Sequence, residues 1–135
     1  MKKTLKLKKN YEFKKILTKG KYYSGFYLDV FAIKGNSNIN KIGIAVGVKV
    51  AKAVKRNRIK RLIFENYRLL EEQLSTGYQI VFLWKKKRDV TEATFDNISK
   101  DMTRILKKIG MLPWEKLLFF WLNYIKNIYL IYFIF

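Results

Sequence analysis

The sequence predicts a single α/β domain, in which helices pack on a sheet of β-strands. Half of the 135 residues are hydrophobic and 16% are aromatic, which is enough for a real core. Residues 41–50 and 78–84 are apolar runs typical of strands, and the residues between them repeat apolar positions at three- and four-residue steps. This order of strand, helix and strand favours a parallel crossover connection.

The first third of the chain predicts a short helix and a long strand. Residues 2–9 carry five lysines, and we expect them to be mobile until a partner binds. They include no apolar stretch, so they do not predict a secretory signal. Residues 11–19 have apolar residues at helical spacing, and Gly20 ends this helix. Residues 22–33 are rich in aromatic and β-branched residues and predict a strand.

Side chains alternate between the two faces of that strand. One face carries Phe26, Leu28, Val30 and Ala32, and the opposite face carries Tyr27, Asp29, Phe31 and Ile33.

The rest of the domain predicts two more strands and two helices. Residues 34–41 form a loop, and residues 41–50 are expected to pair back on the first strand as a hairpin. A basic helix follows and runs to about Leu74. Residues 78–84 predict a buried strand, and residues 91–109 predict a closing helix that ends at Gly110 and Pro113.

The segment from Lys49 to Arg68 is the most informative part of the chain. Between Lys49 and Arg61 it carries seven basic residues and no acidic residue. Helical spacing places Arg56 and Lys60 on one ridge, and Asn57, Arg61 and Arg68 on the next. Like charges at this spacing repel one another by about 0.2–0.5 kcal/mol per pair, so the cost is best explained by a polyanionic partner.

The alternative is a solvated helix face that serves solubility. Two observations weigh against it: no glutamate is interleaved between the basic residues, and the whole chain has a net charge of +19. Such a charge indicates nucleic acid or an anionic membrane. The chain has no cysteine and no histidine, which excludes thiol nucleophiles, disulfides and imidazole bases. The basic run Lys85–Arg88, in contrast, is better explained as a solvated turn.

The run AVKRNRIKRLI, from Ala53 to Ile63, resembles the "RNR" signature of the bacterial ribonuclease P protein subunits. Four further segments occur in the order of that family: LKKNYEFKKILTKG, KIGIAVGVKVAKAV, GYQIVFLW and ILKKIGML. The resemblance covers roughly residues 5–112. A basic helix alone is unspecific, but a basic helix in this order of elements is strongly specific.

The resemblance implies a fold, a function and partners. The fold is a two-layer α/β sandwich with a four-stranded mixed sheet and a left-handed βαβ crossover, like the second domain of ribosomal protein S5. The function is assistance in the endonucleolytic removal of the 5′ leader from precursor tRNA. The partners are a catalytic RNA, which carries the active site and holds Mg²⁺ with the substrate, and precursor tRNA. The location is the bacterial cytoplasm.

The resemblance also implies two sets of site residues. The first set binds RNA: Lys49, Lys52, Arg56, Asn57, Arg58, Lys60, Arg61 and Arg68. The second set lies in a cleft for the single-stranded leader, between the first helix, a sheet face and the crossover: Phe13, Leu17 and Phe31. The sequence departs from the family at Leu17, where an aromatic is usual, and at Val48, Ala51 and Phe64, where lysine, glycine and arginine are usual.

The sequence offers no catalytic residue and no metal site of its own. Ten carboxylates are scattered along the chain, and Glu65, Glu71 and Glu72 are the group that comes closest together. Their spacing is not that of metal ligands, so a solvated helix face explains them better. This agrees with the expectation that the RNA subunit carries out catalysis.

Residues 113–135 form an apolar C-terminal extension of the expected domain, 1–112. Residues 115–135 are almost all apolar, and Asn123, Lys126 and Asn127 form a narrow polar stripe at helical spacing. The stripe fits a helix at a membrane surface better than one that spans the bilayer. Packing on the domain and self-association with a second copy are the alternatives.

Two functions of other classes remain open at this level. The chain could be an RNA-binding or ribosome-associated protein of similar fold that takes no part in cleavage. It could also be a cationic membrane-surface protein in which the extension and the charge act together.

Overall fold

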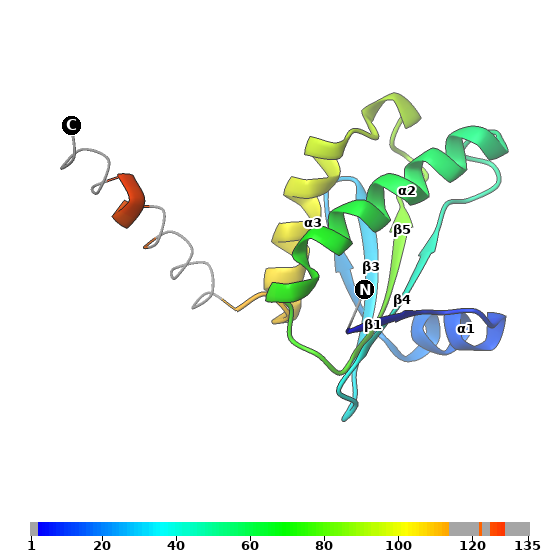
Figure 1. The fold of residues 1–135 in the computed structure, drawn as a ribbon. Coiled ribbons are helices and arrows are strands. Elements are labelled where there is room, and N and C mark those ends of the chain that lie inside the picture. Colours follow the sequence, from blue (N-terminus) through cyan, green and yellow to red (C-terminus); the bar gives the residue numbers. More distant parts are fainter. Residues whose placement is uncertain (1–2, 114–121, 123–124, 129–135) are drawn as a thin grey trace.

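The computed structural model of the chain describes residues 3–113, 122 and 125–128 (Figure 1). The elements follow in the order β1 (Thr4–Lys6), α1 (Asn10–Lys19), β2 (Lys21–Ser24), β3 (Leu28–Lys34), β4 (Asn40–Ala45), α2 (Ala53–Leu70), η1 (Glu71–Gln73), β5 (Tyr78–Trp84), η2 (Val90–Glu92) and α3 (Phe95–Ile109). The α/β class is therefore confirmed.

One mixed sheet contains five strands in the order β1-β4-β5-β3-β2. The expected count of four strands is wrong, because the N-terminus contributes β1 at one edge and the strand predicted over residues 22–33 is two strands, β2 and β3. The expected hairpin between residues 22–33 and 41–50 is also wrong, because β5 lies between β3 and β4. β5 is almost continuously apolar, so it gains most from the central position, where both of its faces are covered.

β4 and β5 are parallel neighbours joined through α2, as the order of strand, helix and strand predicts. The left hand of this crossover stays a prediction from the family resemblance. Of the other expected boundaries, that of residues 78–84 is confirmed, and the closing helix begins four residues later than expected, at Phe95.

The N-terminal segment is held in place, contrary to the expectation that residues 2–9 are mobile. Thr4 to Lys6 pair in parallel with residues 40–42 of β4. The Thr4 hydroxyl lies 2.9 Å from the Tyr67 hydroxyl, and the Lys3 backbone N–H donates to buried Glu71 at 2.8 Å. These contacts join β1 to the C-terminal end of α2, and sequence periodicity gave no sign of them because they are long-range.

The long strand predicted over residues 22–33 is divided into β2 and β3 by a tight turn. The carboxylate of Asp101 on α3 accepts three consecutive backbone N–H groups of this turn, from Phe26, Tyr27 and Leu28, at 2.7–2.9 Å. A Cβ at Gly25 would collide with this carboxylate, so the turn requires glycine there. A buried carboxylate thus terminates what the sequence presents as one strand.

The two faces of the sheet differ. α2 and α3 pack side by side on one face, whereas α1 lies apart from them across the opposite face (Figure 1). The main core lies under α2 and α3 and includes Leu28, Val30, Ile42, Ile59, Ile63, Ile80, Phe82, Ile98, Met102 and Ile105. The two-layer description is correct for this face, but it omits the third, partial layer that α1 adds.

The apolar extension, residues 115–135, lies mostly outside the described residues, so its predicted helix stays a prediction. Within the described part of the chain, no helix is long and apolar enough to cross a membrane.

Candidate nucleic-acid interface

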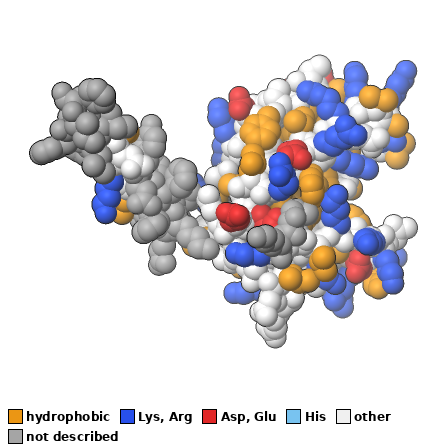
Figure 2. Space-filling view, in the orientation of Figure 1, with side chains coloured by type: hydrophobic (Ala, Val, Ile, Leu, Met, Phe, Trp, Pro, Cys, Tyr) orange, Lys and Arg blue, Asp and Glu red, His pale blue; other side chains and the backbone are white. Residues whose placement is uncertain are grey.

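The N-terminal half of α2 presents a concentrated positive charge. The helix begins after Lys52, whose side chain makes no capping hydrogen bond, and its first turn contains no acidic residue. The N-terminus of a helix already carries a partial positive charge of its dipole, which disfavours cations there. Lys and Arg side chains gather over this end of α2 (Figure 2). Both charge effects are relieved by an anionic partner.

We define the α2 basic surface as the eight residues that the sequence assigned to RNA binding: Lys49, Lys52, Arg56, Asn57, Arg58, Lys60, Arg61 and Arg68. Six of them are exposed, and Arg56 and Lys60 are half-buried. The ridge of Asn57, Arg61 and Arg68 is fully on the outside of the helix, as predicted. The structure thus gathers the eight residues on α2 and on the loop before it.

Two arginines of this surface have partners within the protein. Arg56 donates from Nη1 to the backbone oxygen of Ala51 at 2.8 Å and so fixes the loop before α2. Arg68 forms an exposed ion pair with Glu65 at 2.8 Å. Exposed pairs contribute little, typically below about 1 kcal/mol, so Arg68 can exchange this partner for a phosphate.

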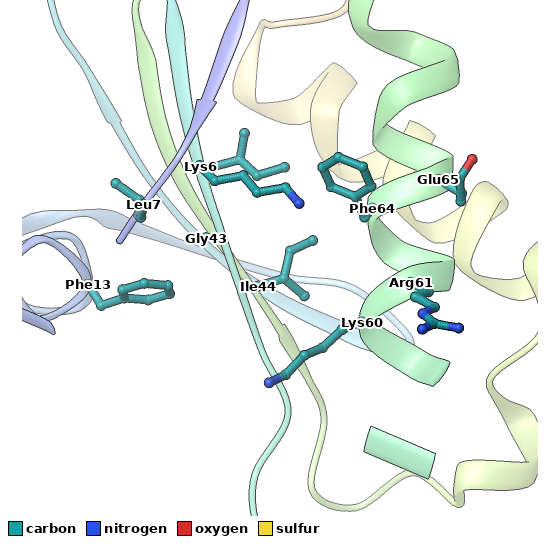
Figure 3. A pocket seen from close by; sticks show the side chains of 10 residues that line it. Lys6, Leu7, Phe13, Gly43, Ile44, Lys60, Arg61, Phe64 and Glu65 are labelled. Atoms are coloured by element: carbon teal, nitrogen blue, oxygen red, sulfur yellow. The ribbon is translucent and has the colours of Figure 1, made fainter. Parts of the chain in front are cut away.

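A hollow of about 280 Å³ lies at the edge of β4, between α1 and α2. It opens where the short strand β1 ends, so that the outer part of β4 is left uncovered. Figure 3 shows Phe13 of α1 and Phe64 of α2 on opposite sides, with Ile44 of β4 between them. Lys60 and Arg61 of the α2 basic surface line the same hollow.

Phe13 is placed by the strand beneath it. A Cβ at Gly43 would collide with the Phe13 ring and would also approach Leu7. The ring therefore rests directly on the backbone of β4, and Phe13 is half-buried. Glycine at this position brings the aromatic ring close to the strand edge and thus close to the basic residues of α2.

The other two expected cleft residues also lie on the α1 face. Phe31 packs against the same small cluster as Phe13, that of Leu7, Ile16 and Val81, and its ring centroid lies 5.1 Å from that of Tyr22. Leu17 is exposed on α1. Neither residue lines the hollow that contains Phe13. The three residues therefore share a face of the sheet, but the structure does not gather them in one pocket.

A second, wider hollow of about 530 Å³ lies at the carboxyl ends of β4 and β5. Tyr22 and Asp29 line it together with the loop after β4 and with Lys85, Lys86 and Lys87. Lys85 is held by Asp29 at 3.3 Å and donates to the Ser24 hydroxyl at 2.7 Å, whereas the next two lysines are exposed. The lysine run at the end of β5 therefore adds positive charge beside the α1 face.

The sequence reasoning missed three residues of the first hollow. Lys6 places its amine 4.1 Å from the centre of the Phe64 ring, and Gly43 supports Phe13. Lys6 was assigned to a mobile tail, although apolar and basic residues alternate over residues 5–8, a pattern typical of a strand. Phe64, which replaces a usual arginine, gives Lys6 an aromatic partner and so retains positive charge at this position.

The other two departures lie in the loop before α2. Val48 is 77% exposed, so the missing lysine is not replaced by a buried contact. Ala51 supplies the backbone oxygen that Arg56 binds, which alanine does as well as glycine.

The carboxylates do not form a metal site. Glu65 pairs with Arg68, and buried Glu71 accepts the Lys3 N–H. Across residues 3–113, 122 and 125–128, no three Asp, Glu, His or Cys side chains come together in a way that could hold a metal ion. The expected absence of a protein metal site and the assignment of Mg²⁺ to the RNA both stay predictions.

Comparison with known proteins agrees with this geometry. A family model described as Ribonuclease P matches residues 1–110. The chain is 39% identical over 107 residues to the ribonuclease P protein component of Clostridium botulinum (strain Langeland), which covers 78% of this chain and 95% of that protein. It is 35% identical over 106 residues to the protein of the same name from Thermoanaerobacter sp. (strain X514), covering 78% and 90%.

Solved structures show the same relationship. The RNase P protein of Staphylococcus aureus superposes with a TM-score of 0.69 at 26% identity, covering 80% of this chain and 97% of that one. The RNase P protein from Thermotoga maritima gives a TM-score of 0.69 at 27% identity, covering 77% and 96%. With the basic α2, the mixed sheet and these similarities in agreement, the chain belongs to the ribonuclease P protein family.

Proposed function

We propose that this chain, as the protein subunit of ribonuclease P, binds the catalytic RNA through the α2 basic surface. It holds the single-stranded 5′ leader of precursor tRNA on the α1 face of the sheet and assists the endonucleolytic removal of that leader. Its partners are the RNase P RNA and precursor tRNA, and the assembled ribonucleoprotein is the endoribonuclease.

The observation that carries this proposal is the hollow at the edge of β4. It brings Phe13, from the face with the expected leader cleft, together with Lys60 and Arg61 from the α2 basic surface. An RNA strand can stack a base on an aromatic ring and place its phosphates against cations within this one site. The two RNA contacts that the family resemblance implies are thus neighbours across the sheet edge.

The chain positions the RNA and neutralises its charge, and it does not supply a group that reacts with the phosphodiester. Stacking on flat side chains stabilises binding by about 1–3 kcal/mol per base, and basic residues follow the backbone without reading its sequence. We assign no catalytic residue to the protein, and we assign Mg²⁺ to the RNA and the substrate. The protein lowers the electrostatic cost of bringing two polyanions together, an effect that matters most when Mg²⁺ is scarce.

Cleavage of precursor tRNA at low Mg²⁺ tests the function. The catalytic RNA is assayed alone and with the purified chain, and we expect faster cleavage at the mature 5′ end with the chain present. Unchanged cleavage accompanied by tight RNA binding would contradict the proposal and would favour the RNA-binding protein without a role in cleavage.

Arg61→Ala tests the α2 basic surface. Arg61 is exposed and has no acidic partner among the described residues. We expect the slope of the logarithm of the RNA-binding constant against the logarithm of the salt concentration to become less steep by about 0.7–0.9, the contribution of one phosphate contact. The preference for the leader should not change. The measurement is a filter-binding titration at several salt concentrations. An unaltered slope would place Arg61 on a solvated face.

We also propose a bacterial cytoplasmic location and a membrane-surface or self-association role for residues 115–135. The support is the sequence pattern of an apolar helix with a narrow polar stripe. Flotation with anionic liposomes, with and without residues 113–135, tests the membrane role, and sedimentation of the same two proteins tests self-association. Identical behaviour of the two proteins in both assays would contradict this part of the proposal.

A further inference from the structure

One guanidinium group outside the α2 basic surface is held in place by the protein itself. Arg88 follows β5, and its Nε donates to the backbone oxygen of Phe26 at 2.7 Å. The guanidinium carbon lies 3.7 Å from the centre of the Phe26 ring and 5.6 Å from that of Tyr27. Arginine stacks on aromatic faces through its planar fork, so the stack and the hydrogen bond together fix the orientation of that fork.

Of the two aromatic rings beside Arg88, that of Phe26 is exposed, whereas that of Tyr27 packs against the main core. Tyr27 stacks on Trp84 with centroids 5.8 Å apart and an interplanar angle of 15°. Trp84 is 2% exposed, and its indole Nε1 donates to the backbone oxygen of Arg88 at 3.3 Å. The backbone of Arg88 is thus connected to the end of β5, and its side chain is connected to the turn between β2 and β3.

The turn that carries Phe26 is equally fixed. Asp101, 1% exposed, accepts the backbone N–H groups of Phe26, Tyr27 and Leu28, and Gly25 lets the turn approach this carboxylate. A buried carboxylate with three donors is a strong anchor. The backbone oxygen that Arg88 binds therefore belongs to an anchored turn.

The terminal nitrogens of the Arg88 guanidinium form no ion pair with an acid among the described residues. Among the described residues, Nη1 and Nη2 of Arg88 have no hydrogen-bond acceptor and no ion-pair partner. The adjacent Asp89 is turned to Thr91 and accepts its backbone N–H and its hydroxyl at 2.9 and 3.0 Å. These two hydrogen bonds also lower the pKa of Asp89. The terminal nitrogens are therefore available for an external anion.

The surroundings indicate which anion. Lys86 and Lys87 are exposed beside Arg88. On the other side, Lys55 and Arg58 of α2 line a hollow of about 160 Å³ together with Val90 and Thr91. Basic residues at the start of α2 therefore lie close to the segment after β5, and the carboxylate of Asp89 lies near Lys55 among them. A flat fork with two free donors matches two oxygens of one phosphate.

We propose that Arg88 is a preorganised receptor for one phosphodiester of an RNA strand that runs from the N-terminal end of α2 across the β5 end of the sheet. This inference rests on the proposed function, and it adds a contact that lies outside the α2 basic surface. Because the guanidinium of Arg88 already has a hydrogen bond and a ring contact, we expect binding to lose less side-chain entropy there than at the exposed Lys86 and Lys87. The partly exposed ring of Phe26 is the support of the fork and not a base platform, because Arg88 occupies its face.

Three variants and a matched control test the inference. Arg88→Ala removes both the charge and the planar guanidinium, and Arg88→Lys keeps the charge alone. Phe26→Leu keeps the arginine but removes the aromatic ring on which its guanidinium stacks. Lys108→Ala is the control, because Lys108 is exposed at the end of α3, near the start of β5 and far from its end. Thermal melts first establish that each variant is folded, and salt titrations then measure binding in two arms.

One arm measures the chain with the catalytic RNA, and the other measures the assembled holoenzyme with precursor tRNA. We expect Arg88→Ala to weaken binding roughly tenfold and to reduce the salt slope by about 0.7–0.9 in at least one arm. Arg88→Lys and Phe26→Leu should weaken binding less while they leave the slope unchanged. The arm in which the loss occurs identifies the RNA that supplies the phosphate.

The inference is overturned if Arg88→Ala matches Lys108→Ala in both arms. It is also overturned if Arg88→Lys binds like the wild type, because charge alone would then suffice. In either case, a reduced salt slope in Arg61→Ala and faster cleavage at low Mg²⁺ with the wild-type chain would leave the proposed function intact.

Discussion

The two faces of the sheet use similar side chains for different purposes. Phe82 of β5 and Phe31 of β3 belong to neighbouring residue pairs of two adjacent strands, because Val30 pairs with Phe82 and Phe31 pairs with Val81. Their side chains therefore lie on opposite faces of the sheet. Phe82 is 0% exposed under α2 and α3, whereas Phe31 is partly buried on the face that α1 covers. The comparison teaches that an aromatic residue is structural or available for binding according to what covers its face.

The closed face is large because two amphipathic helices cover it. The buried residues of α3 include Ile98, Met102 and Ile105, and α2 adds Ile59 and Ile63. The α1 face has a small cluster centred on Leu7, Ile16 and Val81, bordered by hollows at the β4 edge and at the β5 end. We therefore expect stability to depend mainly on one face, and RNA contact to depend on the other face and on the edges.

The largest expected effect tests the closed face. Phe82→Ala should lower the free energy of unfolding by about 3–5 kcal/mol, because it leaves a cavity in the main core. The measurement is urea unfolding, followed by binding titrations at a temperature where the variant is folded. Its preference for precursor over mature tRNA should be that of the wild type. A loss of this preference in the folded variant would contradict the division of roles.

The matched change on the open face has a smaller effect on folding. Phe31→Ala should weaken the binding of precursor tRNA more than that of mature tRNA by about 1–3 kcal/mol, a roughly 5- to 150-fold change in preference, because one stacking platform is lost. The measurement is a pair of binding titrations with a thermal melt. A variant that melts as early as Phe82→Ala while it keeps its preference would make Phe31 a core residue.

The smallest expected effect concerns Tyr67, which joins β1 to α2. Burial raises the pKa of its hydroxyl, and hydrogen bonds with Thr4 and Asn40 oppose that rise. A raised pKa in the folded state contributes stability that is fully present below the unfolded value, near ~10, and is lost as pH rises through the folded value. Stability should therefore fall above pH ~10 more steeply in the wild type than in Tyr67→Phe.

Urea unfolding of both proteins between neutral pH and pH ~11 measures this difference. The phenylalanine variant keeps the ring and lacks the titrating group, so it also controls for the lysines, which lose their charge in the same range. Parallel stability curves for the two proteins would show that the Tyr67 hydroxyl does not contribute.

Several elements follow from local sequence pattern. The helical spacing of apolar residues predicts α1 and most of α2, and the continuous apolar run predicts β5. The basic ridge of α2 follows from the same spacing, because helical periodicity alone decides which side chains share a face. These features depend on residues within a few positions of one another, so the sequence is sufficient to predict them.

Other features were decided by contacts between distant residues. β1 is ordered because Thr4 and Lys3 meet Tyr67 and Glu71, more than sixty residues away. β2 and β3 are separate strands because Asp101 binds the turn between them. Strand order, the support of Phe13 by Gly43 and the ordered fork of Arg88 have the same origin. The sequence by itself determined the α/β fold class and the positive charge of the α2 basic surface. Tertiary structure decided which side chains have fixed positions, because contacts between distant residues leave no periodic signal in the sequence.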